Sequence, residues 1–394
     1  MKWRTILISI YFIPNILLGL IYLNNGILGG DFSGDKIDNA SNYILIYFSE
    51  ILMMILFLCV MYFIFAITYN FRRIKTEFSI FKERFLFYFI FLLQVAYLIY
   101  TQYYGVATLA NKEEVIINNP LKYIFTFFNP DAVFLCSLIL DWKSKKRLTI
   151  LTLVFIISNF FRGWISGAIL QIVILFLTKK FSRKTFKIKY IISLILVGIT
   201  ISPTIYFAKY VSRDAEIPTV ERYISYYSME NYSMILERVF SRFQHLGETY
   251  TLINNIEILR EAEKEKEFVP VYFDHSFRRI LSEVFSYNQQ TMNEFAAKFI
   301  LKRESGGNIH TGILPWLVLS EKSLLTYIIY IMVILSMQYF LFRNLTIDNQ
   351  VAKNYTIWFS MFYLWHGWFF GFVLLLVPSL FYLLILSFNS KVKI

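Results

Sequence analysis

Charged side chains are scarce in this sequence, and the scarcity defines the class of protein. Only 17% of the 394 residues are Asp, Glu, Lys or Arg, whereas soluble proteins average roughly a quarter. Hydrophobic residues make up 57% of the chain. Several runs reach about 20 residues without a charge, the length that a helix needs to cross a bilayer. The composition therefore predicts an all-α, polytopic membrane protein and excludes an ordinary soluble enzyme.

Cysteine and the common catalytic motifs are lacking as well. The two cysteines, Cys59 and Cys136, lie inside apolar runs and offer neither a disulfide framework nor metal-ligand spacing. The sequence contains no GxxxxGK[ST] loop, no GxSxG elbow, no HExxH helix and no Cys/His motif for a metal. The loops expected on the cytoplasmic side are short, which excludes a nucleotide-binding domain. We therefore expect a substrate that arrives from the membrane or from outside.

Positive charge is abundant but confined to particular segments. The formal net charge is +12. Lys and Arg gather in segments that alternate with the apolar runs, at residues 1–4, 70–84, 141–147, 179–189, 343–354 and 390–393. This is the positive-inside pattern of membrane proteins, so the charge signals orientation and does not indicate nucleic-acid binding. It predicts that both termini are cytoplasmic.

The apolar runs predict about 10–12 transmembrane or half-membrane helices. Single spans are expected at residues 5–23, 43–69, 85–103, 123–140, 190–209 and 324–342. Pro130 should break the fourth of these and Ser202-Pro203 the fifth, because proline removes a backbone hydrogen bond. The chain then divides into an N-terminal bundle, one large periplasmic loop and C-terminal transmembrane helices, at residues 1–209, 210–308 and 309–394.

Two apolar stretches have lengths that fit neither one crossing nor two. Residues 148–178, about 31 residues, have basic flanks on both sides, which should share one compartment. Two short helices that meet in a tight turn at Arg162-Gly163 satisfy both constraints. Arg162 would then lie at the tip of the hairpin, facing the outer side or a wet cavity. Residues 355–388 present the same problem and predict a second turn near His366-Gly367.

Ionisable residues in apolar or membrane-proximal positions are the candidate functional groups. Arg162 stands out because an unpaired cation within a membrane costs at least about 2.5–3.5 kcal/mol. In the large loop, "ILERVFSRFQHLGETY" is helical by pattern and places Arg238, Arg242 and His245 on one face. Paired guanidinium groups match the oxygens of a diphosphate. The alternative interpretation is a solvated helix with ordinary ion pairs.

Two further histidines precede or interrupt apolar helices. His310, in "GGNIHTGILPW", stands directly before an apolar helix, where a neutral imidazole can act as a base or hydrogen-bond donor. A helix cap or an interface residue is the alternative for this position. His366, in "YLWHGWFF", is interpreted as structural or interfacial because tryptophans flank it.

Three of these segments together resemble a known family. "FRGWISG", "SRFQHLGETY" and "NEF…GGNIHTGILPWLVLSE" look like segments of bacterial O-antigen polymerases (Wzy type), which belong with the O-antigen ligases in one class of membrane glycosyltransferase. The resemblance implies an enzyme of the inner membrane that transfers a glycan from undecaprenyl diphosphate onto the non-reducing end of a lipid-linked repeat unit at the periplasmic face. The implied partners are the undecaprenyl-diphosphate-linked oligosaccharide as donor and acceptor, membrane lipid and a chain-length regulator protein. No metal, cofactor or nucleic acid is implied.

The resemblance also implies roles for individual residues. Arg162 and Arg242 match the arginines of the family's RG turn and RF helix, and would stabilise the charge on the departing diphosphate. His310 would hydrogen bond to or deprotonate the acceptor hydroxyl. The expected substrate-binding residues are Arg238, His245, Glu321 and Trp164. Glu321 is followed by Lys-Ser-Leu-Leu, where the family commonly has a G-x-x-G turn.

Two other functions stay open. One is a glycosyltransferase that takes a sugar from a polyprenyl monophosphate and uses a catalytic acid in the first outer loop, where Asp31, Asp35 and Asp38 lie. The other is a flippase or transporter for lipid-linked oligosaccharides, which the large loop and the two compressed hairpins fit less well.

Overall fold

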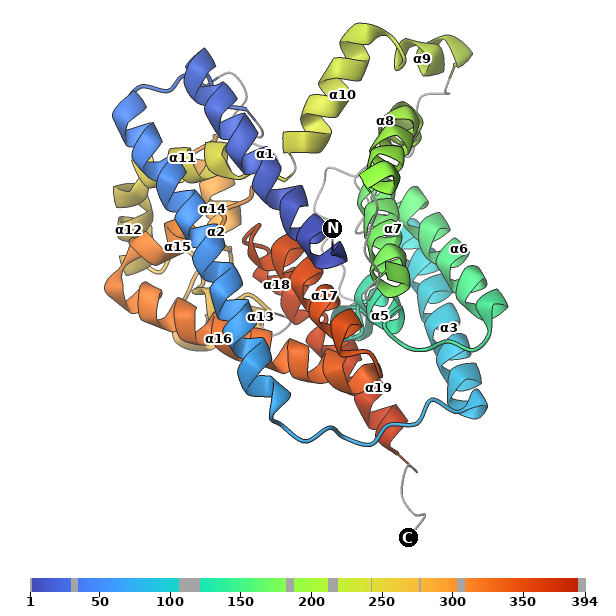
Figure 1. Ribbon diagram of the computed structural model, residues 1–394. Coiled ribbons are helices and arrows are strands. Elements are labelled where there is room, and N and C mark those ends of the chain that lie inside the picture. Colours follow the sequence, from blue (N-terminus) through green and yellow to red (C-terminus); the bar gives the residue numbers. More distant parts are fainter. Residues whose placement is uncertain are drawn as a thin grey trace.

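The chain is all-α in the part that the structure describes. The computed structural model describes residues 2–29, 35–105, 121–181, 188–211, 219–241, 243–275, 278–302 and 309–388. Within these ranges the residues form helices and their connections, with a single antiparallel bridge between Ile27 and Lys36 (Figure 1). The predicted fold class is confirmed at this level.

Five helical segments are long and apolar enough to cross a membrane, judged by length and composition. They are α1 (Trp3–Asn25), α2 (Ala40–Tyr69), α3 (Ile80–Tyr104), Lys322–Leu345 within α16 (Glu321–Leu345), and Phe369–Ser387, which comprises α18 (Phe369–Val373) and α19 (Leu376–Ser387). The chain is therefore a multi-pass membrane protein.

The pattern of burial along α2 shows how a uniformly apolar helix finds its place. Tyr43, Tyr47, Glu50, Met54, Phe57, Met61 and Phe65 are buried at helical spacing. The opposite face exposes large side chains such as Leu45, Phe48 and Leu52, which a bilayer covers without cost because lipid is as apolar as they are. Packing against neighbouring helices, and not hydrophobicity, therefore sets the orientation of α2.

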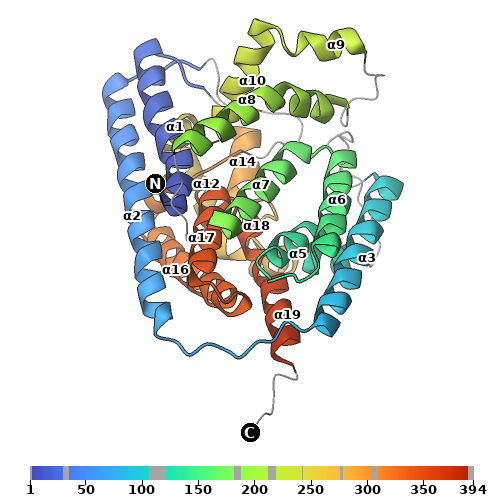
Figure 2. The ribbon, with the colours of Figure 1, turned by 45° about the vertical axis from the view of Figure 1, so that its right-hand side comes forward.

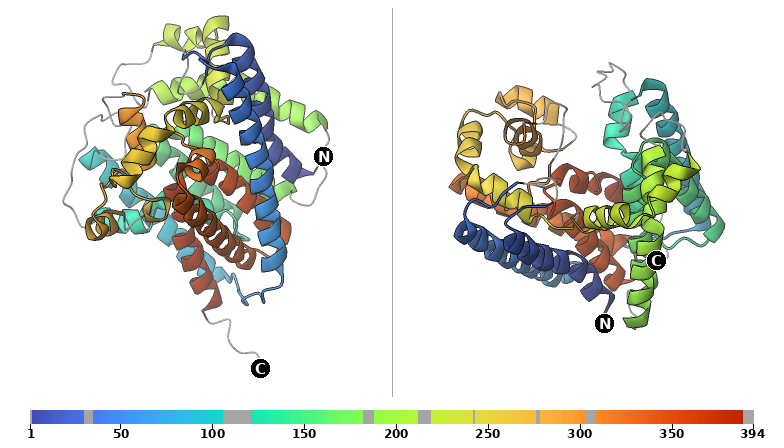
Figure 3. Two further views of the ribbon diagram at one scale, coloured as in Figure 1. Left: turned by 90° about the vertical axis from the view of Figure 1, so that its left-hand side faces the viewer. Right: turned by 90° about the horizontal axis from the view of Figure 1, so that it is seen from above.

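The membrane helices form a bundle whose C-terminal helices lie in the middle (Figures 1 and 2). The antiparallel pair α1 and α2 lies on one side, and α3 with α6 (Lys145–Phe161) on the other. Between them α16 packs on both α2 and α19, and α19 packs on α5 (Pro130–Ser137). The view from above shows the same order (Figure 3).

Both predicted hairpin turns are confirmed. Helix α6 ends at Phe161 and α7 (Ile165–Phe181) begins four residues later, with Arg162 as the C-cap of α6 and Gly163 at φ +78°. Helix α17 (Asn349–Phe359) continues as a π-helical segment, Ser360–Leu364, and the chain then turns at His366-Gly367, with Gly367 at φ +75°. A left-handed φ favours glycine, which explains both positions.

One proline acts as predicted and the other does not. Helix α4 (Leu121–Phe127) ends before Pro130, which begins α5 with Asn129 as its N-cap. Helix α8 (Ile188–Val211), in contrast, continues through Pro203, so the predicted break there is wrong. The Ser202 hydroxyl donates a hydrogen bond to the Ile199 carbonyl at 2.8 Å. In a regular helix the N–H of residue 203 would donate to the Ile199 carbonyl, but proline has no N–H. The Ser202 hydroxyl donates in its place, so this carbonyl stays hydrogen bonded.

The region predicted as a large loop is itself helical. It contains α9 (Val220–Ser225), α10 (Met229–Ser241), α11 (Leu246–Asn254), α12 (Ile256–Lys264), a 3-10 turn (Val271–Phe273), α13 (Arg278–Phe285) and α14 (Met292–Phe299). Helices α9 and α10 lie at the edge of the molecule beyond α8 (Figure 2). Helix α11 packs against α2 and against α15 (Leu314–Leu319). The middle of this region is therefore built into the bundle.

Candidate functional site

Arg162 lies at the tip of the first hairpin but turns inward. Its side chain is 4% exposed, and Nη2 donates to both carboxylate oxygens of Asp131 at 2.8 Å. Nε donates to the Ser158 carbonyl at 3.3 Å, and the guanidinium carbon lies 4.8 Å from the centre of the Tyr97 ring. The prediction that Arg162 faces the outer side or a wet cavity is therefore wrong. A partly buried carboxylate compensates its charge, as buried charges require.

Trp164 is the exposed residue of the same turn. Its backbone N–H donates to the Asn159 carbonyl at 2.8 Å, and about half of its surface is accessible. A tryptophan at this position suits a membrane interface. The structure does not bring Trp164 to the histidines described below.

The predicted helix through Arg238, Arg242 and His245 is interrupted. Helix α10 ends at Ser241, and α11 begins at Leu246. A buried asparagine of α1 explains the break, because Asn15 donates to the Phe243 carbonyl at 2.8 Å and accepts from the His245 N–H at 3.2 Å. Arg238 and His245 therefore do not share a helix face.

Three predicted site residues are only partly described by the structure. Arg242 lies outside the described residues, between Ser241 and Phe243. Arg238 is in α10 and Glu321 is the first residue of α16, but the side chains of both lie outside the described part. Their predicted roles stay predictions.

Three of the four histidines of the chain converge in one buried cluster, formed by His245, His310 and His366. His245 precedes α11, His310 lies in the segment before α15, and His366 lies in the second hairpin turn. The ring centroids are 4.2 to 5.6 Å apart, and the three residues are 0%, 5% and 3% exposed. The sequence indicated His245 and His310 separately, without showing that they meet.

His366 is the member of this histidine cluster that sequence reasoning missed. It was interpreted as structural or interfacial. One local signal distinguishes the three histidines: each is followed within two residues by glycine, at Gly247, Gly312 and Gly367. Such glycines permit close approach of the backbone segments that carry the rings.

Close packing fixes the three segments relative to one another. The Asn293 amide of α14 donates to the Gly367 carbonyl at 3.2 Å, and its oxygen accepts from the Thr311 hydroxyl at 2.9 Å. Gly367 has φ +75°, and a Cβ there would overlap the Thr311 hydroxyl. Gly312 has φ +63° and leaves only 3.3 Å between its Cβ position and Thr249 Oγ1. Close packing therefore holds the backbone directly after His310 and His366 and ties it to α11.

The histidine cluster is buried and in contact with aromatic rings. Burial lowers the pKa of His245, and the neighbouring imidazoles of His366 and His310 lower it further. The Trp368 ring lies 4.5 Å from the His310 ring, and the Tyr11 ring of α1 lies edge-on to His366 at 5.6 Å. Neutral imidazoles can accept a proton, hydrogen bond or ligate a metal, but they do not neutralise a diphosphate.

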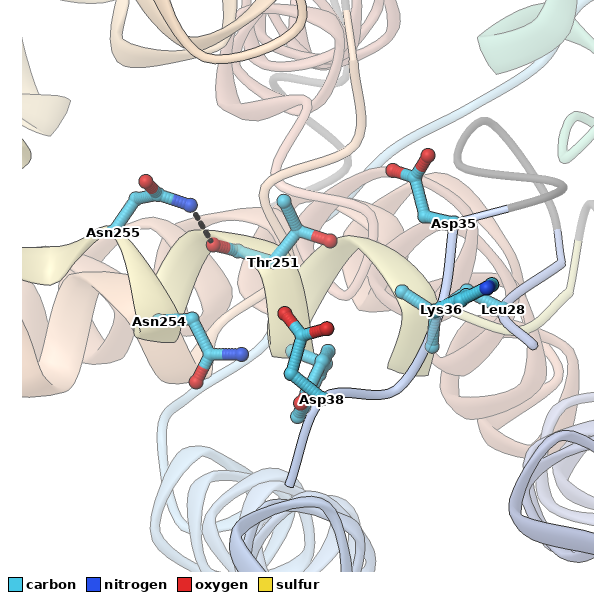
Figure 4. A pocket seen from close by; sticks show the side chains of 8 residues that line it. Leu28, Asp35, Lys36, Asp38, Thr251, Asn254 and Asn255 are labelled. Atoms are coloured by element: carbon cyan, nitrogen blue, oxygen red, sulfur yellow. Dashed lines mark hydrogen bonds between the residues drawn. The ribbon is translucent and has the colours of Figure 1, made fainter. Parts of the chain in front are cut away.

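A second polar site lies on the surface, between the α1–α2 connection and α11 (Figure 4). It is a pocket of about 300 Å³. Asp35, Lys36 and Asp38 line one side, and Thr251, Asn254 and Asn255 line the other. The alternative glycosyltransferase hypothesis uses an aspartate of the first outer loop. Two of its three candidate aspartates, Asp35 and Asp38, therefore lie at a pocket, whereas Asp31 lies outside the described residues.

Interpretation of both sites depends on their own chemistry. The buried histidine cluster joins three distant segments, and the surface pocket joins two. Comparison with known proteins supplies no relative: no protein-family model matches the chain, no curated protein matches it, and no solved structure matches it.

Proposed function

We propose that the protein is a membrane glycosyltransferase of the O-antigen polymerase type. It transfers a glycan from undecaprenyl diphosphate onto the non-reducing end of a lipid-linked repeat unit, at the periplasmic face of the bacterial inner membrane. The observation that supports this most is the meeting of His245 and His310, whose ring centroids are 5.6 Å apart. They come from two of the three segments on which the family resemblance rests.

This meeting favours a functional role over the cap that sequence reasoning left open. The N-cap of α15 is Ile313, so His310 does not cap that helix. The rings of His245 and His310 are buried and both lie against His366. His366 in turn contacts the Tyr11 ring of α1, a helix long enough to span the membrane. In the proposed reaction His310 accepts the proton of the acceptor hydroxyl, the oxygen forms a bond to the anomeric carbon, and the bond to the diphosphate oxygen breaks.

The cation that receives the diphosphate is assigned to the end of α10. Arg162 is already compensated by Asp131, so a diphosphate gains less from it than from an uncompensated guanidinium. Arg242 directly precedes Phe243, which Asn15 of α1 binds next to the histidine cluster. In this proposal Arg242 stabilises the leaving group, Arg238 supports it, and Arg162 is a positioning residue of the hairpin.

The surface pocket favours one alternative, a glycosyltransferase that uses a sugar linked to a polyprenyl monophosphate. Asp35 and Asp38 are exposed carboxylates beside asparagine and threonine side chains (Figure 4). Such a set of groups can bind sugar hydroxyls, and a carboxylate there can serve as the catalytic base.

Gel analysis of surface lipopolysaccharide from a complemented deletion strain tests these functions. We expect His310→Ala and Arg242→Ala to leave a single repeat unit at normal protein level. His275→Ala, the histidine outside the cluster, should give the full ladder. Full ladders from both His310→Ala and Arg242→Ala would exclude the proposed mechanism.

Two other outcomes identify the alternatives. A single unit from Asp35→Asn/Asp38→Asn, with a full ladder from Arg242→Ala, supports the glycosyltransferase that uses the surface pocket. A deletion strain that displays no repeat unit at all indicates a flippase, because a polymerase defect still displays one unit.

A further inference from the structure

His245 is the observation that calls for an additional ligand. It is fully buried, and neither ring nitrogen has a hydrogen-bond partner among the described residues. A buried polar group left without a partner costs about 1–3 kcal/mol. Native structures rarely retain such groups unless an ion or a water satisfies them. Because one ring nitrogen of His245 lies within 4.8 Å of a ring nitrogen of each of the two other histidines, a missing partner fits inside the histidine cluster.

The distances suit one small ion. Each histidine offers a ring nitrogen, and these three atoms lie within 4.8 Å of one another. Around a tetrahedral zinc ion with Zn–N bonds of about 2.0–2.1 Å, ligand nitrogens lie about 3.4 Å apart. Adjustment of roughly 1 Å in the ring positions, through side-chain rotation, is therefore enough to bring all three nitrogens onto one ion.

His366 already has the support typical of a metal ligand. Its Nδ1 lies 3.1 Å from the Met361 carbonyl oxygen. Donation of the Nδ1–H to this carbonyl fixes the tautomer in which Nε2 carries the lone pair. A carbonyl behind the ring in this way orients most metal-bound histidines and makes them better ligands. Met361 belongs to the π-helical segment Ser360–Leu364, a local distortion of the kind found at functional sites.

The donor set selects the class of metal. Within the described part of the chain, the cluster comprises three imidazoles and no carboxylate. Imidazole suits Zn²⁺ and neighbouring transition metals, whereas Mg²⁺ and Ca²⁺ prefer oxygen ligands. Three protein ligands leave the fourth tetrahedral position for a water or a substrate oxygen, the pattern of catalytic zinc sites.

Two acidic side chains are buried near the cluster. Glu248 is buried in the first turn of α11, three residues after His245. Glu50 is buried in α2 beside the Thr249 hydroxyl. Thr249 in turn lies 3.3 Å from the Cβ position of Gly312, two residues after His310. Burial disfavours the charged form of Glu50, so Glu248 is the carboxylate assigned to balance the ion.

We propose that His245, His310 and His366 bind one Zn²⁺ ion, with the fourth coordination position open. This goes beyond the proposed glycosyl transfer, for which the family resemblance implies no metal. The ion uses the single lone pair of the neutral His310 ring, so in the zinc-bound protein another group takes the proton of the acceptor hydroxyl. The ion satisfies one of the two buried ring nitrogens of His245, uses the tautomer that the Met361 carbonyl fixes in His366, and joins the segments before α11, before α15 and before α18.

Metal binding to the purified full-length protein tests the site. The chain is produced with an affinity tag that contains no histidine, stripped with a chelator, and incubated with Zn²⁺ in lipid nanodiscs. We expect about one zinc per chain by mass spectrometry after desalting. His245→Ala and His366→Ala should lower the affinity roughly tenfold or more in competition with a chromophoric chelator. His275→Ala is the matched control and should bind as the wild type does.

Two results would overturn the proposal. One is a folded wild-type protein that retains no zinc after incubation. The other is zinc binding by His245→Ala and His366→Ala that equals that of the wild type, which would assign the ion to another place.

A second measurement keeps the test decisive when a variant fails to fold. Co²⁺ replaces Zn²⁺ in the wild type, and X-ray absorption reports its neighbours. Imidazole nitrogens at about 2.0–2.1 Å support the site, and a shell without imidazole excludes it. Because neither readout is transferase activity, the zinc site and the proposed function can fail separately.

Discussion

The pair formed by Arg162 and Asp131 allows a sharp separation of fold from function. Nη2 of Arg162 contacts both oxygens of Asp131 at 2.8 Å, and the carboxylate side chain is 26% exposed. The pair joins the tip of the α6–α7 hairpin to the N-terminus of α5. Replacing one member removes this link, whereas replacing both with neutral residues removes the link and the uncompensated charge together.

The expected losses of stability follow from what each variant leaves behind. Arg162→Gln leaves the Asp131 carboxylate with the Asn159 amide at 3.3 Å and with limited access to water. Asp131→Asn leaves a guanidinium that keeps the Ser158 carbonyl and the Tyr97 ring. Breaking a buried pair from one side costs about 3–5 kcal/mol, and the partial exposure of Asp131 favours about 3 kcal/mol for either change. The double variant should recover at least about 2 kcal/mol, because a neutral pair carries no desolvation penalty.

The assay combines unfolding with product analysis. The free energy of unfolding is measured by circular dichroism during titration with a denaturing detergent, and the lipopolysaccharide ladder is recorded in the same variants. The exposed pair of Arg260 and Glu257, 2.6 Å apart on α12, is the control. Glu257→Gln should change stability by less than about 1 kcal/mol, since exposed ion pairs contribute little.

Three outcomes are distinct. Recovery of both stability and ladder in Asp131→Asn/Arg162→Gln assigns Arg162 to positioning the hairpin. Recovered stability without a ladder shows that Arg162 contacts the substrate. Single variants that each cost less than about 0.5 kcal/mol, without coupling between them, would refute the electrostatic argument for the pair.

Two further predictions concern a titrating carboxyl and a helix that contains proline. Burial raises the pKa of Asp274 to about 6 although the Arg278 guanidinium opposes it, so the folded protein binds a proton that the unfolded chain releases. The free energy of unfolding should therefore fall by at most about 3 kcal/mol as the pH rises from about 4 through 6. Asp274→Asn should abolish this dependence of stability on pH. A wild-type thermal midpoint that is constant across this pH range would contradict the raised pKa of Asp274. Ser202→Ala should cost about 1 kcal/mol by removing the donor to the Ile199 carbonyl. Ser202→Ala/Pro203→Ala should restore that stability, and equal unfolding energies for both variants would show that the hydroxyl does not replace the missing N–H.

The turns could be predicted from the sequence because the constraints on them are local. Basic residues on both sides of residues 148–178 require an even number of crossings, and the number of residues then leaves room only for two short helices. Gly163 and Gly367 mark where the chain reverses, with φ of +78° and +75°. Composition alone was enough for the all-α class and for the multi-pass character.

The break between α10 and α11 could not be predicted because its cause lies far away in the sequence. The local pattern of residues 235–250 is helical, and nothing within it disfavours a helix strongly. Asn15 of α1 binds the backbone on either side of Gln244, and Gln244 Oε1 then accepts from the Leu246 N–H at 2.9 Å. Tertiary hydrogen bonds of this kind outweigh a propensity difference of a few tenths of a kcal/mol per residue.

The source of positive charge for a diphosphate is what joins the two proposals. Sequence reasoning placed it on Arg162 and Arg242, and Arg162 was the strongest signal because a charge in an apolar run is conspicuous. A lone cation in an apolar environment is costly, and the structure supplies Arg162 with Asp131 as its counter-ion. Burial lowers the pKa of His245, so its imidazole adds no positive charge. Arg242 and an ion held by His245, His310 and His366 are then the two candidate cations for the diphosphate. Two experiments show which of them the reaction uses. If the reaction uses Arg242, Arg242→Ala loses the ladder although zinc is retained. If it uses the ion, removal of zinc loses the ladder although Arg242 is present.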